Sequence, residues 1–122
     1  MRKTILVVED SPITRSLIVS SLEDLSHIRV VEAESGFEAL RKLPENTPDL
    51  IITDINMPDI NGLELVRFAK GSENYKHIPI IIVTTEGRDV DRQRGLALGA
   101  DRYIVKPFEP AVLQEQVTQL LD

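Results

Sequence analysis

Five short apolar runs lie along the chain, and polar residues do not alternate regularly within them. They occupy residues 5–8, 28–31, 50–52, 78–83 and 103–105. A strand that is covered on both faces has this pattern, because neither of its sides meets water, and such strands are typical of parallel sheets in α/β proteins. The pattern therefore predicts five strands of a parallel sheet.

Segments with apolar residues at helical spacing separate these runs. Ser and Asn cap helices, Pro is favoured in the first turn, and Gly or a later Pro ends a helix. The expected boundary residues are Ser11 and Pro12 for the first helix, Ser35 and Pro44 for the second, Asn61 and Gly71 for the third, and Pro110 for the start of the last. Residues 89–99 form the weakest predicted helix, because Gly95 lies inside them at a cost of about 1 kcal/mol relative to Ala. We expect this helix to be marginal and mobile.

A strand followed by a helix, repeated five times, predicts an α/β fold with a doubly wound, five-stranded parallel sheet and five helices. The length of 122 residues suits one domain, so residues 1–122 are expected to form a single unit. For five strands the expected order is 2-1-3-4-5, and ligands of such sheets bind in the crevice at the carboxyl ends of strands 1 and 3.

Charge and composition exclude several classes of function. The 14 basic and 20 acidic side chains give a net charge of -6, which opposes nonspecific binding to nucleic acid or to an anionic membrane. The lack of cysteine excludes a disulfide framework and a thiolate nucleophile. No segment has the length and apolarity of a signal peptide or a membrane span, so a soluble, cytoplasmic protein is expected.

Polar residues directly follow four of the five predicted strands. They are Glu9 and Asp10 after the first strand, Asp54 after the third, Thr84 after the fourth and Lys106 after the fifth. Because strands 1 and 3 are expected to be neighbours, three carboxylates should converge, and like charges at short range are unfavourable without a cation. Mg²⁺ prefers such oxygen ligands, while an ammonium and a hydroxyl bind anionic oxygens. The set predicts a phosphoryl-transfer centre in which an aspartate itself accepts the phosphoryl group.

Five sequence motifs extend this interpretation. They cover residues 7–11 (VVEDS), 53–58 (TDINMP), 61–65 (NGLEL), 83–85 (VTT) and 99–108 (GADRYIVKPF). In this order and at these strand ends, they resemble the receiver domain of two-component response regulators over nearly the whole chain. The resemblance implies a flavodoxin-like fold with the same strand order. It also implies a phosphorylation-activated signalling switch of the single-domain, chemotaxis-regulator type, not an enzyme that turns over a separate substrate.

The resemblance assigns a phosphoacceptor and a metal site. Asp54 would accept a phosphoryl group from a phosphohistidine on a sensor histidine kinase or a phosphotransfer protein. Asp10 and Asp54 would bind Mg²⁺ directly, Asn56 through its backbone carbonyl, and Glu9 through a water molecule.

The resemblance also implies how phosphorylation is detected. Lys106 would hold one phosphoryl oxygen, and Thr84 would move to hydrogen-bond another. Tyr103 would then rotate from an outward to an inward position, and the Lys106–Pro107 bond is expected to be cis. The face made by the fourth helix, fifth strand and fifth helix would control a downstream partner protein. The protein would act as a monomer or as a phosphorylation-induced dimer, without direct contact with nucleic acid or a membrane.

Three neighbouring positions are expected to affect the lifetime of the acyl phosphate. Thr85 stands where many receiver domains carry Ala, and its larger side chain would restrict access to the site. Asn56 and Glu86 flank the expected path of the attacking water. By analogy with the family, they tune the rate of dephosphorylation.

The aromatic residues also allow a simpler interpretation. Taken alone, Tyr103 fits a half-exposed strand aromatic, and its switching role rests on the resemblance. The phenylalanines are expected in the core, at Phe37, Phe68 and Phe108.

Two alternative functions remain open at this point. A Mg²⁺-dependent aspartyl-phosphate phosphatase of the haloacid dehalogenase type places two aspartates one residue apart after strand 1, whereas Glu9 and Asp10 are adjacent here and the chain leaves no room for a cap domain. A flavin-binding module needs hydroxyls and glycines at that strand end, where these two acids would repel a phosphate. The chain ends just after the last apolar stripe, which fits either a stand-alone regulator or the receiver part of a longer protein.

Overall fold

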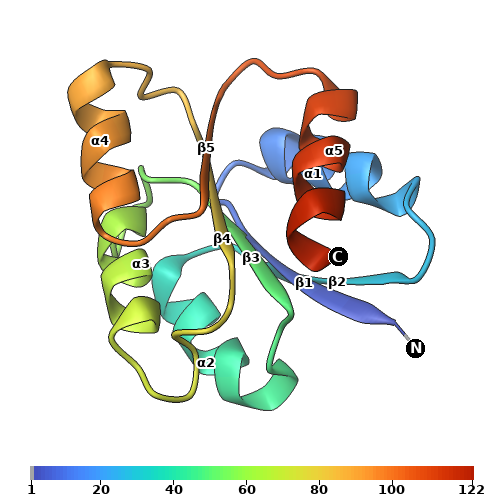
Figure 1. The fold of residues 1–122 in the computed structure, drawn as a ribbon, viewed down its shortest axis with the longest axis horizontal. Helices are drawn as coiled ribbons and strands as arrows, with labels where there is room; N and C mark the ends of the chain where they lie inside the picture. The colour runs from blue at the N-terminus through green and yellow to red at the C-terminus, as the bar shows by residue number, and fades with distance from the viewer. Residues whose placement is uncertain (1) are drawn as a thin grey trace.

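The computed structural model describes residues 2–122, which form ten elements in strict strand and helix alternation (Figure 1). The strands are β1 (Lys3–Val8), β2 (Ile28–Ala33), β3 (Leu50–Thr53), β4 (Ile80–Thr84) and β5 (Arg102–Val105). The helices are α1 (Pro12–Glu23), α2 (Gly36–Asn46), α3 (Gly62–Lys70), α4 (Asp89–Ala97) and α5 (Pro110–Leu121). All strand pairs are parallel and the order is β2-β1-β3-β4-β5, which confirms the predicted fold.

Helices cover both faces of the sheet. Figure 1 shows α1 and α5 on one side, and α2, α3 and α4 on the other. Successive β1 residues point alternately to the two sides, so Leu6 and Val8 join one buried cluster while Ile5 and Val7 join the other. Both clusters are fully apolar at β1, and this explains why the strand sequences do not alternate between apolar and polar residues.

Most helix boundaries lie where the sequence predicts them. The Ser11 hydroxyl accepts a hydrogen bond from Thr14 N at 3.4 Å, and Pro12 is the first residue of α1. Asn61 caps α3 by accepting from Leu63 N at 2.7 Å, and Gly71 is the C-cap of that helix. Pro110 opens α5.

The predicted end of α2 at Pro44 is wrong, because the helix continues to Asn46. Proline removes only its own N–H, so the residues after it can still bond to the preceding turn. Thr47 N donates to Leu43 O at 2.9 Å, and the side-chain Nδ2 of Asn46 donates to Lys42 O at 2.9 Å. Thr47 then ends the helix in the left-handed region, with φ of 40°.

The prediction that the phenylalanines lie in the core is wrong for two of them. Phe37 is 63% exposed and Phe68 is 48% exposed, whereas Phe108 packs at the edge of the α1/α5 cluster. In α2 the small and aliphatic residues Ala39 and Leu43 face the sheet, which turns Phe37 outward. Residue type alone did not predict these orientations, because the inward stripe of each helix was already filled by smaller side chains.

Residues 89–99 contain the predicted fourth helix, α4, which is continuous through the buried Gly95. Its expected mobility stays a prediction. Within residues 2–122, no helix combines the length and the apolarity that crossing a membrane requires.

Candidate acidic site at the carboxyl edge of the sheet

Strand register brings the predicted site residues to one edge of the sheet. Val8 pairs with Thr53, and Asp54 N donates to Val8 O at 3.1 Å, so the acids that follow β1 and β3 emerge side by side. At the neighbouring strands, Thr84 pairs with Val105, and Lys106 N donates to Thr84 O at 2.8 Å. The parallel sheet thus gathers residues from four loops.

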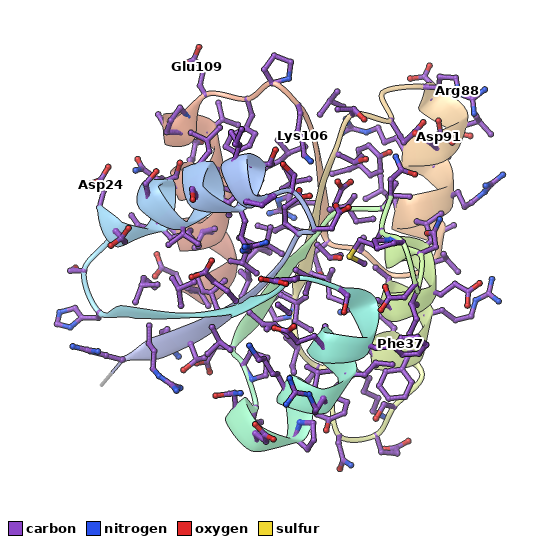
Figure 2. All side chains as sticks on the ribbon, turned by 180° about the vertical axis from the view of Figure 1, so that it is seen from behind. Asp24, Phe37, Arg88, Asp91, Lys106 and Glu109 are labelled. Atoms are coloured by element: carbon purple, nitrogen blue, oxygen red, sulfur yellow. The ribbon has the colours of Figure 1, made fainter. Side chains whose placement is uncertain are left out.

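Lys106 joins two of the acids directly. Its Nζ lies 2.7 Å from Glu9 Oε1 and 3.0 Å from Asp54 Oδ2. Figure 2 labels Lys106 at the end of the sheet from which these loops emerge. The Lys106–Pro107 peptide bond is cis, as predicted. Lys106 is 97 positions from Glu9 in the sequence and 52 from Asp54, so these contacts exist only in the folded chain.

Asp10 completes a cluster of three carboxylates. One oxygen from each of Glu9, Asp10 and Asp54 lies within 4.8 Å of the others. Three carboxylates and one ammonium sum to -2, counting -3 from the acids and +1 from Lys106. Hard oxygen donors with this charge fit Mg²⁺, so the donor set is compatible with the predicted metal. The contribution of the Asn56 carbonyl stays a prediction.

Burial makes the negative charges of the cluster costly to hold close together. Glu9 is only 1% exposed, and this burial raises its pKa. The hydrogen bonds from Lys106 and from Ser11 N lower the pKa of Glu9 and oppose the rise, while the negative charge of Asp54 adds to it. Burial alone would lower the pKa of Lys106, but its hydrogen bonds to Glu9 and Asp54 raise it overall. The lysine therefore stays protonated, and a further cation would relieve the crowding of negative charge.

The Asp54 carboxylate is fixed from two directions. Its Oδ1 accepts from Ile55 N at 2.6 Å and from Asn56 N at 3.4 Å, while Oδ2 faces Lys106. Gly62, at the start of α3, packs against the same backbone, since a Cβ there would lie 1.8 Å from Asp54 O. Only a glycine allows α3 to begin this close to the acid.

Glu86 connects the remaining predicted residues through both its backbone and its side chain. Its N–H donates to Thr84 Oγ1 at 3.3 Å, its carbonyl accepts from the Tyr103 hydroxyl, and its carboxylate accepts from Asn56 Nδ2 at 2.9 Å. The Thr84 hydroxyl thus bonds to Glu86 and not to the acidic cluster. The sequence placed Asn56 and Glu86 beside the site but did not predict the bond between them, which depends on how two loops approach each other.

Tyr103 lies inward and not half-exposed. It is 6% exposed, and burial, followed by the charge of Asp91 and that of Glu86, raises its pKa. The inward position matches one of the two orientations that the resemblance implies. The rotation between them stays a prediction.

Comparison with known proteins identifies the class of this fold and site. A family model of the response regulator receiver domain matches residues 5–118. The chemotaxis protein CheY1 of Helicobacter pylori is 44% identical over 118 residues, which cover 96% of this chain and 95% of that protein. The chemotaxis response regulator CheY4 of Vibrio cholerae superposes with a TM-score of 0.90 at 36% identity, over 99% of this chain and 100% of that one.

A further solved structure bears on the metal site. The receiver domain of the sensor histidine kinase PA1611 from Pseudomonas aeruginosa contains a magnesium ion coordinated in its active site cleft. It superposes with a TM-score of 0.89 at 30% identity, over 99% of this chain and 98% of that one.

The chain belongs to the response regulator receiver domain family, as its motifs predicted. Its chemotaxis relatives are signalling proteins and not classical enzymes, and the family makes this chain a phosphorylation-regulated signalling switch. Family membership therefore favours the switch over the phosphatase and over the flavin-binding module.

Proposed function

We propose that Asp54 accepts a phosphoryl group from a phosphohistidine of a sensor histidine kinase or a phosphotransfer protein. An oxygen of the Asp54 carboxylate attacks phosphorus, an O–P bond forms, and the P–N bond breaks with its electron pair passing to the imidazole, which takes up a proton. The observation that carries the proposal is the Lys106 ammonium, 3.0 Å from Asp54 Oδ2 and 2.7 Å from Glu9 Oε1. Placed there, it stabilises the additional negative charge of an arriving phosphoryl group.

Asp10, Asp54 and the Asn56 carbonyl would hold Mg²⁺, and Glu9 would contact it through water. When bound, the metal neutralises charge on the phosphoryl oxygens. The proposal is supported by the three carboxylate oxygens within 4.8 Å of one another and by the deep burial of Glu9.

The signal would leave the site through Thr84 and Tyr103. Thr84 would donate its hydroxyl to a phosphoryl oxygen, and Glu86 links that threonine to the Tyr103 hydroxyl. Tyr103 belongs to β5, next to α4 and α5, so its position would alter the surface that these elements share. Exposed apolar side chains on that surface suit a protein partner, and they are Leu96, Val105 and Val112.

Through this change at Tyr103, the chain would pass a phosphorylation signal to another protein. Residues 1–122 would act as one receiver unit whose α4/β5/α5 face controls a downstream protein. The unit would do so as a monomer or as a phosphorylation-induced dimer.

Phosphorylation by a small donor tests the proposal. Incubation with Mg²⁺ and acetyl phosphate should add one phosphoryl group to the intact mass, and chelation of Mg²⁺ should prevent the gain. Asp54→Asn should gain none. Asp89→Asn is the matched control, because it makes the same change at an exposed aspartate outside the cluster, and it should be phosphorylated normally. Phosphorylation of Asp54→Asn, or no gain by the unsubstituted protein, would overturn the assignment.

A further inference from the structure

Gly95 lies on the face of α4 that packs against the sheet, directly beside Tyr103. A Cβ at this position would lie 3.2 Å from Tyr103 Cδ2 and 3.3 Å from Tyr103 Cε2. It would also lie 2.9 Å from Ile82 Cδ1 of β4. The ring therefore leaves too little room for a Cβ at position 95 unless the ring or the helix shifts.

The same face of α4 carries a second unusual residue one helical turn earlier. Asp91 is largely buried for a carboxylate and pairs with Arg88, with Arg88 Nε 3.0 Å from Asp91 Oδ2. Figure 2 shows both residues at the start of α4, where Arg88 is the N-cap residue. Residues four apart share one face of a helix, so Asp91 and Gly95 together form the side of α4 next to the tyrosine.

The inward position of Tyr103 depends on this gap as well as on its hydrogen bond. The hydroxyl donates to Glu86 O at one end of the side chain, and the ring packs on Gly95 and Ile82 at the other. The hydrogen bond constrains only the tip of the side chain. A side chain at position 95 would crowd the ring between α4 and the sheet.

We propose that Gly95 is a positioning residue that sets the inward orientation of Tyr103 and makes the packing of α4 depend on that orientation. The proposal rests on the proposed function in one respect, namely that Tyr103 transmits the phosphorylation signal. Because glycine has no side chain, the space beside it is filled only while the ring is inward. An outward ring would leave a cavity there, which favours an inward shift of α4. A methyl group at position 95 would fill that space and favour the outward ring.

The composition of the chain offers a direct measurement of the ring. It contains two tyrosines and no tryptophan, so Tyr75→Phe leaves Tyr103 as the only strongly fluorescent side chain. In that background, quenching of the fluorescence by acrylamide measures how accessible Tyr103 is. The parent should be poorly quenched, and Gly95→Ala should raise the quenching constant several-fold.

Gly71→Ala is the matched control. It adds the same methyl group at the C-cap of α3, where a Cβ would lie 3.2 Å from Arg67 O and contacts no tyrosine. This variant should be quenched like the parent. If Gly95→Ala is folded and is also quenched like the parent, Gly95 does not position Tyr103 and the proposal is overturned.

A second variant separates the two close contacts and protects against a loss of folding. Ile82→Val removes the Cδ1 atom that a Cβ at position 95 would meet at 2.9 Å, and leaves the contact with the tyrosine ring unchanged. If Tyr103 stays accessible in Ile82→Val/Gly95→Ala, the ring itself is displaced, as proposed. If the double variant shields Tyr103 as well as the parent does, the conflict lay with Ile82 and the proposal fails.

Intact mass after acetyl phosphate treatment separates this proposal from the proposed function. Gly95 lies against Ile82 and Tyr103 and not against the carboxylate cluster of Glu9, Asp10 and Asp54. Gly95→Ala should therefore still gain one phosphoryl group while its Tyr103 stays accessible. Failure of every variant and of the parent to gain a phosphoryl group would contradict the function of Asp54. The quenching comparison would still decide the role of Gly95.

Discussion

At the scale of single residues, the site depends on one ammonium shared between two acids. Glu9 is buried, so it cannot regain solvation by turning outward, and Lys106 is the cation within hydrogen-bond distance of it. Breaking a buried ion pair on one side is costly because the remaining charge is left without compensation. Lys106 therefore contributes to folding as well as to the proposed chemistry.

Lys106→Met should lower the free energy of unfolding by about 3 kcal/mol at neutral pH, because it leaves Glu9 and Asp54 unpaired. Urea denaturation measures this change. Lys76→Met is the control, since it removes the same charge from an exposed pair with Glu73, where the cost should stay below about 1 kcal/mol. Equal losses in the two variants would show that the buried pairs stabilise the fold no more than an exposed pair does.

At the scale of secondary-structure elements, α2 and the β3–α3 loop are tied together by Asp59. Its carboxylate accepts from Gly36 N at 3.0 Å, from Phe37 N at 2.9 Å and from Ile60 N at 2.7 Å. The first two donors are the opening N–H groups of α2, which have no partner within the helix. The loop that carries Asp54 toward α3 is thereby anchored to a neighbouring helix.

These hydrogen bonds, above all the one from Phe37 N, lower the pKa of Asp59 to about 2. Because the pKa is lower in the folded state, the stabilisation is fully present above the ordinary pKa near 4 and is lost as the pH falls toward 2. Asp59→Asn should therefore be less stable than the parent at pH 6, and the difference should shrink at pH 3. Urea denaturation at the two pH values checks this, and a difference that does not depend on pH would contradict it.

The sequence predicted β1, β3 and β4 well because these strands are buried between two apolar layers, so a local run of apolar residues identifies them. It predicted the convergence of Glu9, Asp10, Asp54 and Lys106 because the order typical of five-stranded doubly wound sheets places strands 1 and 3 side by side. It failed where the outcome depends on which side chains fill a helix face or on how separate loops meet. Phe37 is exposed because Ala39 and Leu43 fill the inward face of α2, and the bond between Asn56 and Glu86 depends on the approach of two separate loops.

At the scale of the whole molecule, the fold separates the place where phosphoryl transfer is proposed from the surface where it is detected. The acids lie at the β1 and β3 ends, and the proposed output face lies at the β5 edge with α4 and α5. Between them, Glu86 bonds to Thr84, Asn56 and Tyr103. Any change at Asp54 that moves Thr84 therefore has a short route to Tyr103.

Mg²⁺ should raise the melting temperature, because a ligand that binds only the folded chain stabilises that chain. The free energy of unfolding should rise by about 2.7 kcal/mol at a free Mg²⁺ concentration 100 times the Kd. Thermal unfolding followed by circular dichroism measures the shift. Asp10→Asn should abolish it, whereas Asp89→Asn, at an exposed aspartate outside the cluster, should retain it. The same shift in Asp10→Asn would place the metal elsewhere.

The proposed switch requires that the phosphoryl group is carried by Asp54 and by no other acid. Borohydride reduction of the protein after phosphorylation by acetyl phosphate converts an aspartyl phosphate to homoserine, and peptide mass spectrometry then locates the modified position. We expect homoserine at position 54 alone, with none when Mg²⁺ is chelated. Homoserine at position 10, or an unmodified position 54 in phosphorylated protein, would contradict it.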